Sequence, residues 1–305
     1  MPELPDITVY VEALSARVAG RTLERVRIKS PFVLRTVEPA VEHAAGRKVQ
    51  EVFRLGKRVV LGLERDLFLV VHLMIAGRLR WWDAPHVWKP GRIDVAAFEF
   101  DSGLLVLTEA SMKKRASLHV VQGREGVLAM HAGGVGVFAS GAAEFGAAIR
   151  RENRTLKRAL TDPRIVDGIG NAYSDEILHA ARLSPLKLTG SMTPDEVARL
   201  HQAAARLLTE WTARLRKDFG MDGAGPGRFP GPGQITAFRP DFAVHGRYNK
   251  PCPVCGARVQ RIVYAENETN YCPGCQTGGR VLADRSLSRL LKEDWPRTLE
   301  ELEGA

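Results

Sequence analysis

The chain has 305 residues, which is enough for two domains and a small third module. Its hydrophobic fraction of 45% supports a sizeable core, and no apolar run reaches the length of a transmembrane helix, so we expect no membrane association. The first residues are charged and polar rather than those of a secretory signal, so we expect a cytoplasmic protein. A formal net charge of +9 favours a polyanionic partner such as nucleic acid over a merely solvated basic surface.

The first part of the chain carries the signals of a helix followed by short strands. Residues 8–18 have apolar side chains at helix-compatible spacing, and Gly20 follows as a stop signal. Strand-like runs lie at residues 57–63, 67–74, 93–100, 104–107 and 117–121, with glycines in the turns between them. We therefore expect an antiparallel β-sandwich with a helix over residues 1–138.

The rest of the chain changes to helical signals. Residues 131–141, rich in Gly and Ala, mark the hinge. Helices are predicted over residues 154–160, 171–181 and 194–215, with Pro194 at the first position of the third. Residues 221–232, dense in Gly and Pro, predict a mobile loop, and residues 286–292 predict a short helix. The predicted fold class is α+β, with an N-terminal β-sandwich and a C-terminal helical domain.

All four cysteines lie after residue 250, in two CxxC pairs. This position argues against a secreted disulfide framework and for a local metal site. Two CxxC turns complete a tetrahedral zinc site, and four sulfurs leave no open coordination position. We expect one structural zinc rather than free or redox-active thiols, bound by Cys252, Cys255, Cys272 and Cys275.

The chain between the two cysteine pairs is predicted to form a hairpin. Residues 258–264 have the composition of one of its strands, and Tyr271 leads into the second pair. Several cations lie around the first pair without an intervening acidic residue, which makes the hairpin a candidate groove-probing element. These cations are Arg247, Lys250, Arg258 and Arg261.

The N-terminal sequence Met-Pro-Glu-Leu-Pro-Asp permits a second kind of chemistry. A proline at position 2 means little alone, but removal of Met1 would expose Pro2 as a secondary amine. An α-amine has a pKa near 8, so it is partly neutral at physiological pH and can attack a carbon such as a sugar C1′. Glu3 beside it is a candidate general acid or base.

A third signal lies at the start of the helix predicted over residues 171–181. Glycines at positions 168 and 170 allow a phosphate to approach exposed helix N–H groups, and Asn171 adds a side-chain donor. A plain helix-entry turn explains this pattern equally well when it is taken alone.

Together the three signals resemble the formamidopyrimidine-DNA glycosylase/endonuclease VIII family. The N-terminal hexapeptide is similar to the signature of these enzymes, residues 168–178 to their helix–two-turns–helix segment, and residues 252–275 to their zinc finger. The resemblance covers about residues 1–277 and implies damaged DNA as the partner. It also implies that Pro2 is a Schiff-base nucleophile and that Glu3 is its catalytic acid.

The resemblance also implies several DNA contacts. Lys57 lies where the family keeps a phosphate-contacting lysine, although a surface strand lysine is the simpler interpretation of the residue alone. Asn171 is similar to a phosphate-gripping asparagine, and Lys157 lies where a basic residue often approaches the lesion. Met74 resembles the side chain that fills the gap left by the extruded base, and a core methionine is the equal alternative.

The sequence departs from the family at two places. Asn267, between two glutamates, stands where the zinc hairpin usually has a phosphate-gripping arginine. Residues 111–116 correspond to the loop with an intercalating Arg-Phe pair; they keep the cations Lys113, Lys114 and Arg115 and lose the aromatic residue. We therefore expect weak action on 8-oxoguanine paired with cytosine.

The expected function is excision of oxidised bases with cleavage of the resulting abasic site, in base excision repair, by a monomer bound to nucleoid DNA. The expected domains are residues 1–138 (catalytic), 142–245 (helix–two-turns–helix), 246–278 (zinc finger) and 279–305 (tail). One alternative is a catalytically weak or inactive damage-binding protein of the same fold. A second is a zinc-ribbon module of transcription or RNA handling, which leaves the Pro2 pattern unexplained.

Overall fold

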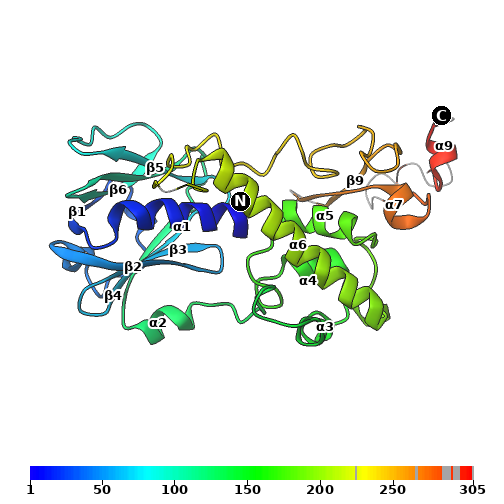
Figure 1. Cartoon of the computed structure of the whole chain (residues 1–305), viewed down its shortest axis with the longest axis horizontal. Helices are drawn as coiled ribbons and strands as arrows, with labels where there is room; N and C mark the ends of the chain where they lie inside the picture. The colour runs from blue at the N-terminus through cyan, green and yellow to red at the C-terminus, as the bar shows by residue number, and fades with distance from the viewer. Residues whose placement is uncertain (224, 265–266, 284–289, 291–295, 304–305) are drawn as a thin grey trace. The chain divides into compact units, whose positions relative to one another are not determined.

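The computed structural model describes residues 1–223, 225–264, 267–283, 290 and 296–303 (Figure 1). These residues divide into two compact units. Unit 1 comprises Met1–Ala132 and Thr209–Thr236, and unit 2 comprises Gly133–Leu208 and Ala237–Ala305. The boundary between the units runs through the long helix α6 (Pro194–Asp218), which contributes residues to both.

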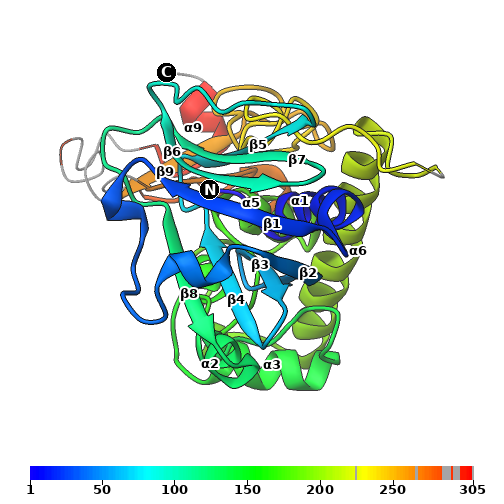
Figure 2. The same ribbon diagram turned by 90° about the vertical axis from the view of Figure 1, so that its left-hand side faces the viewer.

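Unit 1 is built on one antiparallel sheet in the strand order β5-β7-β6-β1-β2-β3-β4-β8 (Figure 2). The strands are β1 (Thr22–Ile28), β2 (Arg47–Leu55), β3 (Arg58–Leu63), β4 (Leu67–His72), β5 (Gly77–Asp83), β6 (Asp94–Phe100), β7 (Gly103–Glu109) and β8 (Ser117–Gln122). Strands β1 and β2 are joined only by the pairs Thr22↔Lys48 and Leu23↔Arg47, so the sheet consists of two four-stranded halves.

The inner faces of the two halves share one hydrophobic core. Leu61 and Leu69 from one half lie in the same cluster as Phe98 and Leu107 from the other. Neighbouring residues of a strand point to opposite faces, and the alternate residues Val60 and Phe68 pack instead with α2 (Arg124–Ala129). The expected N-terminal antiparallel β-domain is confirmed, and its two layers are parts of one continuous sheet.

Helix α1 (Leu4–Val18) packs into this core through Tyr10, Leu14 and other apolar side chains. It begins four residues before the predicted start. The prediction was based on the spacing of apolar residues, which does not detect an N-terminal cap. Glu3 occupies the N-cap position, and its backbone N–H donates to the Asp6 carboxylate at 2.9 Å. The short 3-10 turns η1 (Pro31–Val33) and η2 (Val41–Ala44) complete this region.

The five strand runs predicted in the N-terminal part are all strands in the structure, and three further strands were not predicted. Strands β3, β4, β6, β7 and β8 coincide with the predicted runs to within two residues at each end. Strands β1, β2 and β5 were missed, because the prediction relied on mostly apolar runs, whereas these strands mix charged and apolar residues and are only partly buried.

Unit 2 contains the expected helices and a metal-binding module. Its helices are α3 (Ala142–Arg150), α4 (Leu156–Thr161), α5 (Asn171–Ala180) and the first part of α6, with the 3-10 turn η3 (Thr189–Ser191). Helix α3 was not predicted. A Cβ on its Gly146 would lie 2.7 Å from a methyl carbon of Val197, so the small residue allows α3 and α6 to approach closely.

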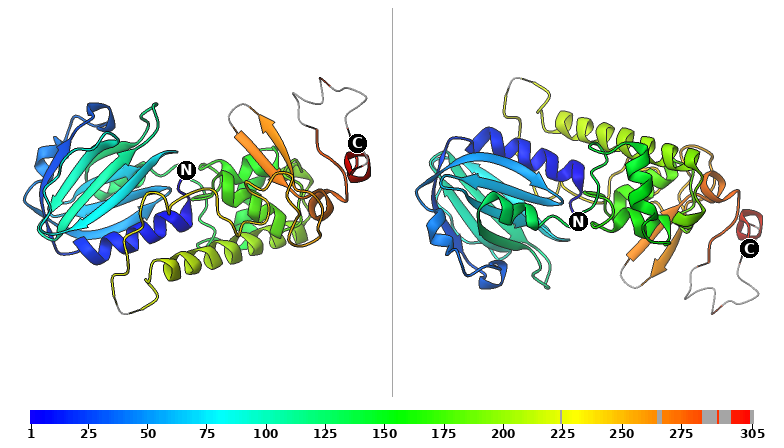
Figure 3. Two further views of the ribbon diagram at one scale, coloured as in Figure 1. Left: turned by 90° about the horizontal axis from the view of Figure 1, so that it is seen from above. Right: turned by 90° about the horizontal axis from the view of Figure 1, so that it is seen from below.

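The cysteine module consists of the hairpin β9 (Gln260–Tyr264) and β10 (Asn267–Tyr271), followed by α7 (Pro273–Thr277), as Figure 3 shows. Helix α5 contacts both β10 and α7. The tail includes α9 (Leu299–Glu303), and the helix predicted over residues 286–292 lies outside the described residues except for Leu290. Within the described part of the chain, no helix is both long and apolar enough to cross a membrane.

Candidate active site and metal centre

The N-terminus of α1 is buried in unit 1. Pro2 is buried, and Glu3 and Asp6 are each only 2% exposed. The bond from the Glu3 N–H to Asp6 fixes the backbone immediately after Pro2. Burial of two carboxylates beside an N-terminal proline is costly unless the charges are compensated, which marks this end of the helix as a candidate reaction site.

The electrostatic surroundings of the terminus include two cations. Burial lowers the pKa of the Met1 α-amine below its usual value; Glu3 opposes this effect, and Arg78 and Lys57 add to it. Lys57 is 9% exposed and lies in the two-residue turn between β2 and β3, where Gly56 takes a positive φ of 63°. The structure thus brings Lys57 into electrostatic range of the N-terminus.

The turn between β4 and β5 presents two apolar side chains. Met74 is partly exposed and has a φ of 52°, a left-handed conformation that costs a non-glycine residue on the order of 1 kcal/mol. Ile75 beside it is 57% exposed. Met74 is therefore not a core methionine, and Ile75 is a neighbour that the sequence analysis did not single out.

The loop between β7 and β8 presents a cationic surface with one apolar residue. Met112 is 99% exposed, and Lys113, Lys114 and Arg115 are exposed beside it. The loop is fixed by the buried side chain of Glu109, which is 1% exposed. The Glu109 carboxylate accepts the N–H groups of Arg115 at 2.8 Å and Ala116 at 3.1 Å. Met112 was missed as a candidate, although an apolar residue within a basic run was a visible signal.

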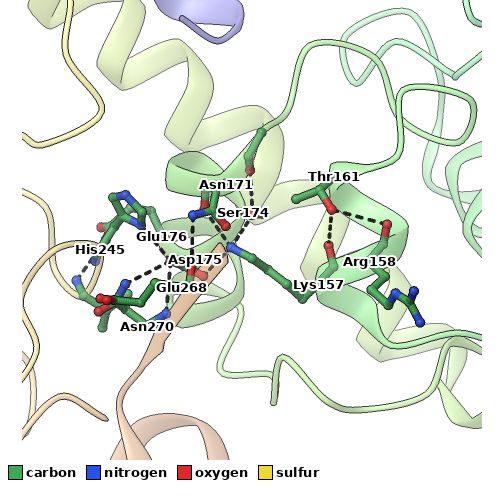
Figure 4. A network of polar contacts seen from close by, with 12 residues as sticks. Lys157, Arg158, Thr161, Asn171, Ser174, Asp175, Glu176, His245, Glu268 and Asn270 are labelled. Atoms are coloured by element: carbon green, nitrogen blue, oxygen red, sulfur yellow. Dashed lines mark hydrogen bonds and ion pairs between the residues drawn. The ribbon is translucent and has the colours of Figure 1, made fainter. Parts of the chain in front are cut away.

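Lys157 lies in the interior of unit 2 rather than on its surface (Figure 4). Its Nζ donates to Asp175 Oδ1 at 2.5 Å, to Ser174 Oγ at 2.9 Å and to the Asn171 carbonyl at 2.7 Å. These three bonds use all the donors of an ammonium group. Lys157 is 8% exposed. It therefore fixes the N-terminal turn of α5, which contains Asn171, rather than facing solvent.

The network in Figure 4 continues into the cysteine module. Asp175 Oδ2 lies 2.7 Å from His245 Nδ1 and accepts the Asn270 N–H at 3.1 Å. The Asn171 side-chain amide donates to the Glu268 carbonyl of β10 at 2.9 Å. These bonds tie the start of α5 to the hairpin, so the two candidate DNA-binding elements of unit 2 are one hydrogen-bonded assembly.

Glu176 adds a further anchor to the same assembly. Its carboxylate accepts the backbone N–H groups of Ala243 at 2.7 Å and of Val244 and His245 at 2.8 Å. Burial raises the pKa of Glu176, and the three N–H donors oppose that rise. The segment that leads into the first cysteine pair is thereby fixed to α5.

The four cysteine sulfurs converge as a metal site requires. Cys252 Sγ and Cys275 Sγ are 3.9 Å apart, and Cys255 Sγ and Cys272 Sγ are 3.3 Å apart. Four sulfurs about 2.3 Å from one zinc ion would be about 3.8 Å apart, so the residues fit the ion. A Cβ on Gly274 would lie 3.0 Å from Cys255 Sγ, which explains the glycine in the second CxxC turn.

A histidine that the sequence analysis missed lies against this cluster. His179 of α5 is 6% exposed, and its Nε2 is 3.3 Å from Cys252 Sγ. No local motif contains it, because it is far from the cysteines in sequence.

Asn267 is the first residue of β10 and pairs with Tyr264, next to the tip of the hairpin.

Comparisons with known proteins cover nearly the whole chain. Residues 1–137 match the family model of the formamidopyrimidine-DNA glycosylase N-terminal domain, and residues 139–217 match that of its H2TH domain. Residues 249–278 match the model of the zinc finger found in FPG and IleRS.

Individual relatives agree with these models. A formamidopyrimidine-DNA glycosylase of Thermus thermophilus is 33% identical over 285 residues, 92% of this chain and 100% of that protein. A Mycobacterium tuberculosis protein named "Uncharacterized formamidopyrimidine-DNA glycosylase-like protein" is 42% identical over 137 residues, 45% of this chain and 80% of that protein. A solved structure of Lactococcus lactis Fpg in complex with abasic-site DNA has a TM-score of 0.76 at 22% identity, covering 90% of this chain and 99% of that one. With a buried N-terminal Pro-Glu pair, an antiparallel β-domain, a helical domain and a zinc finger in this order, the chain belongs to the formamidopyrimidine-DNA glycosylase family of DNA-repair enzymes.

Proposed function

We propose that this chain is a bifunctional DNA glycosylase and abasic-site lyase that acts through a Schiff base at Pro2. The observation that carries the proposal is the buried N-terminus of α1, where Pro2 precedes Glu3 and the adjoining Met1 amine lies within electrostatic range of Lys57. Family membership supports a DNA glycosylase of base excision repair. The Schiff base and the lyase step go beyond it and are proposed here.

The proposed reaction begins when Met1 is removed and the Pro2 amine becomes the terminus. The damaged nucleotide leaves the base stack, because its C1′ is unreachable inside a duplex. The Pro2 nitrogen attacks C1′ and loses its proton, and the base leaves with its bonding electron pair after protonation from Glu3. The C1′–O4′ bond then breaks, O4′ takes up a proton, and the opened sugar is left as an iminium on Pro2. Loss of a C2′ proton from this iminium expels the 3′ phosphate, and water finally releases the sugar fragment from Pro2.

The cations of the site fit this sequence of steps. Burial and the neighbouring Lys57 and Arg78 lower the pKa of the α-amine at Met1, and the same surroundings favour a neutral, nucleophilic amine at Pro2. We propose that Lys57 also contacts the phosphate beside the lesion. In unit 2 we propose that Asn171 and the hairpin tip at Asn267 contact phosphates, and that Lys157 acts indirectly by fixing the first turn of α5.

The proposed lesion class rests on the DNA found in structures of a similar protein. Solved structures of the L. lactis protein contain DNA with an abasic site, with Fapy-dG and with an oxidised pyrimidine. We propose ring-opened purines, oxidised pyrimidines and abasic sites as the substrates of this chain. We further propose a cytoplasmic monomer on nucleoid DNA, with domains at residues 1–138, 142–245, 246–278 and 279–305.

Borohydride trapping tests the nucleophile. Protein without Met1, as verified by intact mass, should form a covalent adduct with abasic-site duplex DNA. The same chain with an uncleavable N-terminal extension should not, because Pro2 is then an amide. Equal trapping by the extended protein would assign the nucleophile to a lysine. No trapping by the processed protein, with retained DNA binding, would favour a damage-binding protein without catalysis.

The role of Glu3 is tested by separating the two activities. Glu3→Gln should slow base excision by about two orders of magnitude or more, since general acid catalysis contributes roughly 100-fold to 10,000-fold. Cleavage of a preformed abasic site needs no protonated base and should be slowed less. Equal loss of both activities would assign Glu3 to placement of Pro2 rather than to proton transfer.

A further inference from the structure

The zinc site has five candidate donors rather than four. His179, Cys252, Cys272 and Cys275 form a group whose ligand atoms all lie within 4.8 Å of one another. Cys255 is outside this group, although its Sγ is 3.3 Å from Cys272 Sγ. The three sulfurs of Cys252, Cys272 and Cys275 are therefore shared between two sets of four donors.

The two remaining donors differ in their exposure. Cys255 is exposed to solvent, whereas His179 is 6% exposed. Among the shared cysteines, Cys252 and Cys272 are 3% and 0% exposed. Cys255 Sγ lies 3.3 Å from Cys272 Sγ, and His179 Nε2 lies 3.3 Å from Cys252 Sγ, so each donor contacts a different member of the shared set.

A structural zinc has four ligands in a tetrahedral arrangement, so three shared sulfurs leave one position for a further sulfur or nitrogen. Imidazole nitrogen is an ordinary zinc ligand, and sites with three cysteines and one histidine are common structural sites. His179 also lies in the last turn of α5, which contacts α7 after the second cysteine pair, so its imidazole is held near the cluster by packing.

We propose that His179 is a reserve zinc ligand. In the intact protein four cysteines bind the ion, and His179 lies beside the Cys252 thiolate at 3.3 Å. When Cys255 is lost, His179 completes a site with Cys252, Cys272 and Cys275. The exposed Cys255 thiolate is the one that oxidants and alkylating agents reach first, so this arrangement keeps the finger folded in the conditions that create oxidised DNA.

Metal content of purified variants gives the first test. Cys255→Ala should retain close to one zinc per chain, whereas Cys272→Ala should lose the ion, because no second donor replaces a shared sulfur. The double variant Cys255→Ala/His179→Phe should also lose it. His201→Phe in the Cys255→Ala background is the matched control, because His201 bonds the Val137 carbonyl and lies outside the metal group.

Cobalt substitution identifies the ligand. In Cys255→Ala the thiolate-to-cobalt charge-transfer absorption should fall by about a quarter, as four thiolates become three, with d–d bands still typical of tetrahedral coordination. The double variant should show no such bands. A zinc-free but folded Cys255→Ala protein, or equal zinc in the single and double variants, would overturn the proposal.

Alkylation of the intact protein gives a test that does not depend on folding of a cysteine variant. N-ethylmaleimide should modify Cys255 first, as intact mass and peptide mapping would show, without release of zinc. In His179→Phe the same modification should release zinc within the time of the reaction. Retention of zinc by alkylated His179→Phe would show that a different group replaces Cys255.

Discussion

At the scale of single residues, burial decides which ionisable groups of this chain can change charge. His72 ends strand β4 next to the turn that carries Met74. Burial lowers its pKa to about 4, and the positive charges of Arg58 and Lys57 add to the effect. The imidazole is therefore neutral at physiological pH, beside a lysine that we place in the reaction site.

The lowered pKa of His72 predicts a loss of stability in acid. The unfolded chain binds a proton near pH 6.5 and the folded chain only near pH 4, so the free energy of unfolding falls as the pH drops through this window. The loss should be on the order of 3 kcal/mol at most. Urea unfolding of wild type and His72→Gln at pH 7 and pH 4.5 measures it. The variant should lose less stability than wild type between the two pH values; equal losses would exclude His72 as the cause.

At the scale of elements, one loop and one helix start carry exposed residues and are held in place by buried, hydrogen-bonded side chains. The β7–β8 loop rests on the Glu109 carboxylate, and the start of α5 rests on Lys157 and Asp175. Because these buried side chains fix the backbone, exposed side chains of the loop or helix start can be replaced without moving it.

Removal of the Lys157 anchor should destabilise unit 2. Lys157→Met leaves the Asp175 carboxylate buried beside His245 without its ammonium partner, at an expected cost of about 3–5 kcal/mol. Denaturant unfolding measures this change. Arg158→Met is the matched control, since Arg158 is the exposed neighbour in the same helix and its removal should cost less than about 0.5 kcal/mol. Similar losses for both variants would contradict a buried anchor.

The β7–β8 loop should act as an apolar wedge through Met112. Proteins that open base steps insert side chains such as Met between them, and Met112 is 99% exposed among cations. Met112→Ala should weaken binding to abasic-site duplex by about 3-fold to 10-fold, with an unchanged free energy of unfolding. Binding titrations with abasic and undamaged duplexes measure this. Val37→Ala, at an 85% exposed position, is the control; an equal effect on undamaged DNA would argue against a wedge.

At the scale of the whole molecule, the charge of +9 supplies attraction to DNA that does not depend on sequence. Lesion choice depends instead on the few groups that hold an opened duplex. Asn267, the first residue of β10, is neutral, so the phosphate contact that we propose for it should be weaker than that of a cation.

Restoring a charge at the hairpin tip should therefore change both affinity and salt dependence. Asn267→Arg should tighten duplex binding and steepen the slope of log K against log salt by about 1, because one more phosphate is neutralised. Wild type should excise an oxidised pyrimidine faster than 8-oxoguanine opposite cytosine in the same sequence context. A clear wild-type preference for 8-oxoguanine would show that other residues compensate for Asn267 and for the missing aromatic residue.

The sequence by itself determined the parts whose chemistry is local. The paired CxxC turns predicted the zinc finger, and the N-terminal hexapeptide, the glycine-flanked helix start and the finger together identified the family. Long apolar runs predicted β3 and β4, since a run that is buried on both faces contains little else. Each of these signals is contained in a single short stretch of the chain.

The tertiary structure decided what depends on residues far apart in sequence. Strands β1, β2 and β5 have mixed patterns and form because their neighbours supply the hydrogen bonds. Lys157 was expected at the lesion and is an internal anchor, because Ser174 and Asp175 lie beside it only in the folded chain. His179 becomes a candidate ligand for the same reason, since α5 and the cysteines meet only through packing, and no spacing rule in the sequence records that contact.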